Sequence, residues 1–270
     1  MRLRQVLTPL AAGALAVAFS ASVPARAAGW APAATATVHP GVQTITGGAQ
    51  CTANFVFQAN GITYLGQAAH CSGTGAATDT NGCTSKSLPL GTPVTVAGYT
   101  GTLAYNSWLT MQAAHEADPE TCAYNDLALI QLPAAAVADT NPSVPTYGGP
   151  TGVGGPVASG GNVYSYGNSS LRLGLTPLSP KRGVAVDNTP GGWSTDVYTV
   201  TPGIPGDSGS GFLDGSGKAI GILSTVALAP LPASNGVGTL AKEIAYAQAH
   251  GVSGLTLVNG TQPFNASALA

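Results

Sequence analysis

The stretch "NFVFQANGITYLGQAAHC", residues 54–71, carries the clearest strand signal in this 270-residue chain. Its apolar runs "NFVFQ" and "ITYLGQA" flank Asn60-Gly61, a preferred hairpin turn. Short apolar or alternating runs separated by turn signals recur from residue 44 to residue 226, which predicts a chain of β-strands. Because no helical pattern alternates with them, a parallel βαβ sheet is disfavoured, and antiparallel barrels or a sandwich remain.

Two further stretches divide the chain. The Gly- and Pro-rich segment "PTYGGPTGVGGPV", residues 145–157, predicts a connector between two β-units. In "GTLAKEIAYAQAHG", Leu240, Ile244 and Ala247 have helical spacing, and Gly251 is placed to end a helix. We therefore expect one C-terminal helix, followed by an exposed tail over residues 259–270.

Composition excludes several classes of protein. A hydrophobic content of 44% indicates a real core, so a disordered chain is disfavoured. Only 7% of the residues are charged and the formal net charge is −2, which leaves no basic stripe for a polyanion. We expect neither nucleic acid nor a membrane as a partner.

The N-terminus has the pattern of an export signal. Arg2 and Arg4 precede the apolar run "LAAGALAVAF", and the small residues of "ARA" at 25–27 follow at the spacing that a signal peptidase reads. The apolar run is too short for a membrane anchor. We expect residues 1–28 to be a signal peptide, residues 29–44 to be a short pro-segment or linker, and the protein to be secreted.

The chain has four cysteines, Cys51, Cys71, Cys83 and Cys122. An even number in an exported chain predicts two disulfides, of which three connectivities are possible. The sequence lacks the tight Cys-x-x-Cys pair that a zinc site would usually show, so we expect neither a metal nor a cofactor.

One constellation of residues has the pattern of nucleophilic catalysis. Ser208 lies in the turn-rich stretch "TPGIPGDSGSGF", and a serine hydroxyl becomes a useful nucleophile only beside a general base. Of four histidines, His70 alone closes an apolar strand. A catalytic imidazole also needs a buried acceptor for its other nitrogen, and Asp126 alone among the acids opens a strongly apolar strand, "NDLALIQL". The alternative is that Asp126 merely caps a turn.

The motifs "AAHC", "NDLAL" and "GDSGSG", in this order, closely resemble the chymotrypsin family of serine proteases, and most nearly its bacterial, streptogrisin-like members. The resemblance implies an all-β fold of two packed antiparallel six-stranded β-barrels with a C-terminal α-helix. It covers residues 45–258, with barrel one over about 45–145 and barrel two over about 157–258.

The resemblance also implies roles. Ser208 attacks the substrate carbonyl, His70 acts as base and then as acid, and Asp126 orients His70. The N–H groups of Gly206 and Ser208 form the oxyanion hole. The implied disulfides are Cys51–Cys71 and Cys83–Cys122.

Activation and specificity are expected to differ from animal members of the family. In animal members a new N-terminus, freed by cleavage, pairs with the Asp before the nucleophile, here Asp207. The corresponding stretch in this chain, "ITGG" at residues 45–48, lies too close to Cys51 for such an N-terminus to reach Asp207. A basic residue, Arg172 or Arg182, is the expected partner. The predicted substrate-binding residues are Pro202, Ser224, Thr225 and Val226.

No carboxylate stands where a Lys or Arg side chain of a substrate would need one, so we expect a small or apolar residue before the cleaved bond. The expected partners of a monomeric enzyme are polypeptide substrates and proteinaceous protease inhibitors. An α/β-hydrolase is disfavoured because its triad order is different. The alternative function is a secreted binding protein on the same fold with little or no catalytic activity.

Overall fold

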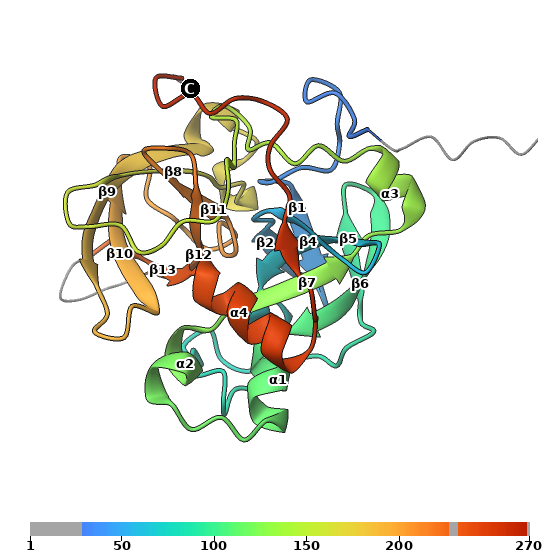
Figure 1. Ribbon diagram of the computed structural model, residues 1–270, viewed down its shortest axis with the longest axis vertical. Helices are drawn as coiled ribbons and strands as arrows, with labels where there is room; N and C mark the ends of the chain where they lie inside the picture. Colours follow the sequence, from blue (N-terminus) through green and yellow to red (C-terminus); the bar gives the residue numbers. More distant parts are fainter. Residues whose placement is uncertain (1–28, 227–231, 269–270) are drawn as a thin grey trace, which may run out of the picture.

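The computed structural model describes residues 29–226 and 232–268, and the side chain of Val226 is not among the described parts. The expected signal peptide, residues 1–28, lies outside them. Two antiparallel β-sheets lie side by side (Figure 1). One contains the strands of the first half of the chain together with the last strand, β14 (Thr256–Leu257), and the other contains the remaining strands of the second half. The all-β prediction with two β-units is therefore confirmed.

The first sheet has eight strands in the spatial order β14-β3-β4-β7-β6-β5-β1-β2. Its strands are β1 (Gln43–Thr46), β2 (Ala49–Thr52), β3 (Val56–Ala59), β4 (Ile62–Ala68), β5 (Pro93–Val96), β6 (Tyr99–Asn106), β7 (Leu127–Gln131) and β14 (Thr256–Leu257).

The second sheet is a closed six-stranded barrel in the order β10-β13-β12-β11-β8-β9, as the resemblance implied. Its strands are β8 (Asn162–Tyr166), β9 (Pro180–Asn188), β10 (Ser194–Thr199), β11 (Gly211–Asp214), β12 (Ala219–Val226) and β13 (Asn235–Thr239). The connector 145–157 precedes this barrel and contains no strand longer than an isolated bridge.

The hairpin of the opening stretch forms as predicted. Strands β3 and β4 pair from Val56 with Leu65 to Ala59 with Ile62. The turn residues Asn60 and Gly61 both have positive φ, 51° and 78°, as a two-residue hairpin turn of this kind requires.

The first sheet differs from the expected six-stranded barrel. Strand β14, at residues 256–257, was expected in the second barrel, but it pairs with β3 of the first sheet, where Thr256 faces Gln58 and Leu257 faces Phe57. The physical reason is that β3 would otherwise leave an unpaired edge beside the buried Leu255. The last strand therefore returns to the sheet of the first half of the chain.

Both terminal segments make contacts with this body. Phe264 lies in the expected tail, yet its ring packs edge-on against Tyr164 with centroids 5.4 Å apart. In the expected pro-segment, Val38 is fully buried and Ala31 donates its N–H to the carbonyl of Thr140. Residues 259–268 are otherwise mostly exposed, as expected for the tail, and Phe264 is one side chain that anchors them.

The predicted C-terminal helix is confirmed as α4 (Leu240–His250), with Gly251 as its C-terminal cap. It packs against β7 of the first sheet and against β12 and β13 of the barrel, and Figure 1 shows it across the junction of the two halves. Three short helices of five to seven residues were not predicted, because such lengths give too few turns for a periodic signal. They are α1 (Ser107–Ala113), α2 (Pro119–Tyr124) and α3 (Ala134–Ala138).

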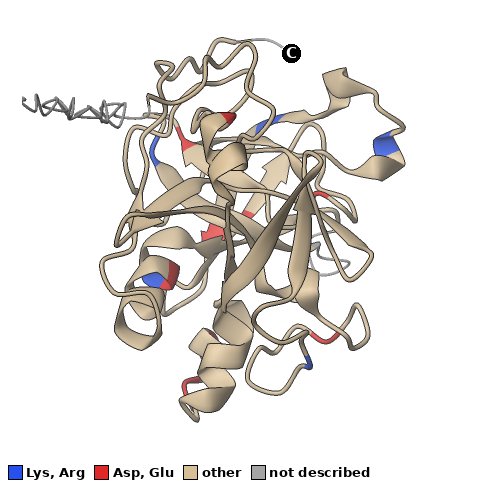
Figure 2. Ribbon diagram, turned by 90° about the vertical axis from the view of Figure 1, so that its right-hand side faces the viewer, with Lys and Arg blue, Asp and Glu red and all other residues tan. Residues whose placement is uncertain are grey.

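The few charged residues are scattered over the ribbon (Figure 2). No helix within residues 29–226 and 232–268 is long and apolar enough to cross a bilayer.

Candidate active site

Strand pairing brings His70 and Asp126 together. Strands β4 and β7 pair up to Ala68 and Leu127, so the short 3₁₀ helix Ala69–Ser72 begins beside Asp126. The Nδ1 of His70 lies 2.6 Å from Oδ2 of Asp126, and the backbone N–H of His70 donates to Oδ1 at 2.9 Å. The carboxylate thus holds both the ring and the backbone of this histidine.

A second contact to Asp126 comes from the other half of the molecule. Ser224 on β12 donates its hydroxyl to Oδ2 of Asp126 at 2.5 Å. Sequence reasoning placed Ser224 in the substrate-binding strand but did not foresee this bond, because nothing in the local sequence indicates contact with a residue in the first sheet.

The electrostatics of the pair favour the charged imidazole. Burial alone would lower the pKa of His70, but the charge of Asp126 and the hydrogen bond between them outweigh it and raise that pKa above its ordinary value. The side chain of His70 is 26% exposed while that of Asp126 is 3% exposed. The histidine can therefore exchange protons with a ligand while the carboxylate is shielded from water.

Ser208 lies in a turn whose shape depends on glycine. Gly206 and Gly209 have positive φ of 94° and 86°. A Cβ on Gly209 would lie 2.7 Å from the carbonyl oxygen of Thr52, and one on Gly206 would collide with Gln50. The carbonyl of Ser208 accepts the N–H of Thr52 at 2.9 Å, which ties the turn to the first sheet.

Two N–H groups of this turn are available as donors. Within the described residues, neither Gly206 nor Ser208 donates its backbone N–H to a hydrogen bond. Ser169 donates its hydroxyl to the carbonyl oxygen of Pro205 at 2.5 Å. Because the C=O and N–H of a trans peptide point in opposite directions, the N–H of Gly206 points away from Ser169.

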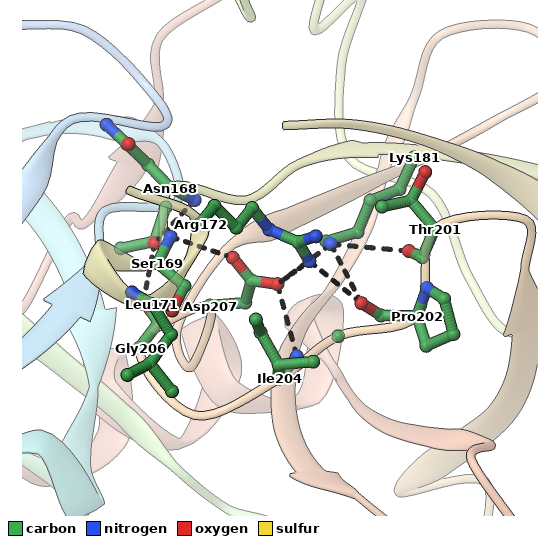
Figure 3. Close-up of polar contacts among 12 residues, drawn as sticks. Asn168, Ser169, Leu171, Arg172, Lys181, Thr201, Pro202, Ile204, Gly206 and Asp207 are labelled. Carbon is green, nitrogen blue, oxygen red and sulfur yellow. Dashed lines mark hydrogen bonds and ion pairs between the residues drawn. The ribbon is translucent and has the colours of Figure 1, made fainter. Parts of the chain in front are cut away.

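Asp207 is held by two buried cations. Its Oδ2 lies 2.6 Å from Nη2 of Arg172 and 2.8 Å from Nζ of Lys181 (Figure 3). The sequence left Arg172 and Arg182 as alternatives. Arg172 makes the contact and Arg182 is exposed on β9, while nothing in the sequence indicates the second partner, Lys181.

The wider network makes this carboxylate the anchor of the turn. Asp207 also accepts the N–H groups of Ser169 and Ile204 at 3.0 and 3.1 Å. Burial alone would raise the pKa of Asp207, but the positive charges of Lys181 and Arg172 and their hydrogen bonds hold it below the ordinary value. Burial lowers the pKa of Lys181.

His70, Ser208, Ser224 and Thr225 line one cleft of about 700 Å³. Asp126 lies behind His70, and the predicted Pro202 is not among the lining residues. The carbonyl of Pro202 instead accepts Arg172 and Lys181 at 2.9 and 3.3 Å. Sequence reasoning missed one wall of the cleft, residues 75–80, which lie in a loop without a motif. Val226 ends β12, but its side chain is outside the described parts.

Both predicted disulfides are present. Cys51 is bonded to Cys71, next to His70, and Cys83 is bonded to Cys122. They close loops of 20 and 39 residues, and each stabilises the fold by roughly 3 kcal/mol, mainly by restricting the unfolded chain.

Solved bacterial serine proteases have the same architecture. Thermobifida fusca protease A is 18% identical over 83% of this chain and 99% of its own, with a TM-score of 0.53. Nocardiopsis protease is 17% identical over 82% and 98%, with a TM-score of 0.50. A Glu endopeptidase is 14% identical over 82% and 96%, with a TM-score of 0.51. The sequence matches no protein-family model and no curated protein. At these identities the similarity establishes the fold.

Proposed function

We propose that this chain, which has the chymotrypsin-like fold of bacterial serine proteases, is a secreted serine endopeptidase. The observation that carries the proposal is the shared cleft: a histidine already paired with a buried aspartate lies in it with Ser208 and with two unused N–H donors. Two disulfides in so small a protein suit an oxidising, extracellular compartment.

The reaction divides into two transfers of the acyl group. The Oγ of Ser208 attacks the carbonyl carbon of the scissile bond while Nε2 of His70 takes the hydroxyl proton. Asp126, bonded to Nδ1, keeps the ring in the orientation that exposes Nε2 and stabilises the imidazolium. His70 then protonates the leaving amine, and a water activated by the same imidazole hydrolyses the acyl-enzyme.

The oxyanion that forms in each step needs donors that do not have to reorganise. The N–H groups of Gly206 and Ser208 supply them, in a turn whose shape Asp207 and the glycines set. Loss of one such donor raises the barrier by about 3 kcal/mol.

We propose that the residue before the cleaved bond is small or apolar rather than Lys or Arg. The predicted pocket residues that line the cleft, Ser224 and Thr225, are uncharged. Asp79, which also lines the cleft, accepts the N–H of Ala76 within its own loop. A substrate cation would therefore find no carboxylate at Ser224 or Thr225 to offset the cost of its desolvation.

Labelling with a fluorophosphonate probe tests the proposal. We expect the wild type to be labelled and to cleave a peptide library after small or apolar residues, whereas Ser208→Ala does neither. Absence of labelling on folded wild-type protein would favour a binding protein on this fold. Cleavage mainly after Lys or Arg would contradict the proposed specificity alone.

A further inference from the structure

Helix α4 carries a buried carboxyl group directly behind the proposed triad. Glu243 is fully buried, and its Oε1 accepts the backbone N–H of Asp126 at 3.0 Å. This bond joins a helix that packs on the second barrel to the residue that holds His70. The catalytic steps described above make no use of Glu243.

The other hydrogen bonds of Asp126 among the described residues use its carboxylate and its carbonyl. Its carboxylate accepts His70 and Ser224, and its carbonyl accepts the N–H of Ala69 at 2.5 Å. Its own N–H lies one residue before β7, so no neighbouring strand accepts it. A buried N–H needs a partner, and Glu243 supplies it.

The structure points to a role for this bond, which rests on the proposed protease function. We propose that Glu243 is a positioning residue of the triad: by accepting the N–H of Asp126, it fixes the carboxylate that orients His70.

The surroundings of Glu243 favour its neutral form. It lies near Asp126 and near Tyr105 on β6. Tyr105 in turn lies near Tyr246 on α4, with Glu116 beyond it. None of the ion pairs among the described residues includes Glu243. Burial, with the charge of Asp126 added, raises the pKa of Glu243 to about 8 despite the opposing effect of the N–H bond.

A neutral acid serves this role well. Its carbonyl oxygen accepts the N–H of Asp126 without placing a second negative charge behind the carboxylate. The charge felt by His70 at neutral pH then comes from Asp126 alone.

Three substitutions in α4 test the role. Glu243→Met keeps the approximate size but removes the acceptor, so we expect kcat to fall about tenfold or more, with KM changed less than about twofold. Glu243→Gln restores a neutral carbonyl acceptor and is expected to recover most of that loss. Ala245→Gln, on the exposed side of the same helix, is the matched control and should match the wild type.

The pH profile separates a neutral from a charged Glu243. With a neutral acid, Glu243→Gln leaves the acid limb of kcat/KM where it is in the wild type. Removal of a real negative charge would instead move that limb to lower pH, because the pKa of His70 would drop.

A readout that needs no activity completes the experiment. In the Ser208→Ala background, we expect the low-field NMR signal of the His70 Nδ1 proton to be shifted or lost with Glu243→Met and kept with Glu243→Gln. If Glu243→Met does not fold, Glu243→Asp, whose shorter side chain cannot reach the N–H of Asp126, replaces it. An unchanged signal and unchanged kcat in a folded Met or Asp variant would overturn the proposal. If wild-type protein is not labelled by the fluorophosphonate, the protease proposal fails, while the NMR signal still decides the positioning role.

Discussion

Asp207 and Glu243 are both fully buried carboxyl groups next to the proposed catalytic residues, but their pKa values move in opposite directions. Asp207 faces Arg172 and Lys181, and its pKa is below the ordinary value. Glu243 accepts the N–H of Asp126 and has no cationic partner among the described residues, and its pKa is raised to about 8. Burial is the same at both sites, so the cations account for the difference.

This difference matches what each site must hold in place. The ionised Asp207 gathers two cations and the N–H groups of Ser169 and Ile204, and so anchors the turn that carries Ser208. The neutral Glu243 accepts a single N–H and adds no charge behind Asp126. One site uses a buried charge, and the other avoids one.

The largest expected effect comes from removing the charge at the first site. Asp207→Asn leaves Arg172 and Lys181 buried without a counter-ion, so we expect a loss of about 3–5 kcal/mol in the free energy of unfolding, measured by urea denaturation, together with loss of activity. Asp214→Asn, which alters a turn carboxylate, is the control and should change stability by about 1 kcal/mol or less. A stable, active Asp207→Asn variant would mean that the cations do not depend on this carboxylate.

The second expected effect is a pH dependence at Glu243. Its folded pKa of about 8 exceeds the ordinary value of 4.5, so its contribution to stability is complete below pH 4.5 and is lost as the pH rises toward 8. In that window we expect the wild type to lose about 1.4 kcal/mol per pH unit relative to Glu243→Gln, with no further change above it. Urea unfolding of both proteins from pH 4 to pH 9 measures this difference, and parallel curves would show that Glu243 is ionised in the folded protein.

The smallest expected effect separates the two cations of the first site. Lys181→Met leaves Asp207 paired with Arg172 as a neutral pair and removes a lysine whose pKa burial already lowers. We therefore expect a change in stability below about 1 kcal/mol and retained activity. Arg172→Met, measured by the same urea denaturation, should cost more, because the bonds of Arg172 to Asp207 and to the carbonyl of Pro202, at 2.6 and 2.9 Å, are shorter than those of Lys181, at 2.8 and 3.3 Å. Equal losses in both variants would show that Asp207 needs both positive charges.

Much of the fold and the candidate site could be predicted, because the signals are local. The hairpin of β3 and β4, helix α4 and the two β-units follow from side-chain periodicity and turn chemistry. His70, Ser208 and Asp126 each lie next to a strand or a shaped turn, and the structure brings His70 and Ser208 into one cleft, with Asp126 directly behind His70.

Other features could not be predicted, because they depend on which distant surface a residue meets. Lys181 and Arg182 are neighbours on β9, and only the orientation of that strand in the barrel directs Lys181 inward to Asp207. A glutamate in a helical sequence is ordinarily expected on the exposed face. Only the packing of α4 against both sheets shows that Glu243 is buried. The pairing of β14 with β3 and the packing of Phe264 on Tyr164 likewise join residues far apart in the chain.

The sequence by itself determined the all-β class, the positions of most strands, the export signal as an expectation and the three residues proposed to carry out catalysis. Periodicity, turns and motif order are visible in the order of residues along the chain, so they do not depend on long-range contacts. Only the tertiary structure decided the charge partners of Asp207, the contact of Ser224 with Asp126 and the burial of Glu243. Each depends on the long-range packing of the two halves, which sets the burial and nearby charge that control a group's protonation.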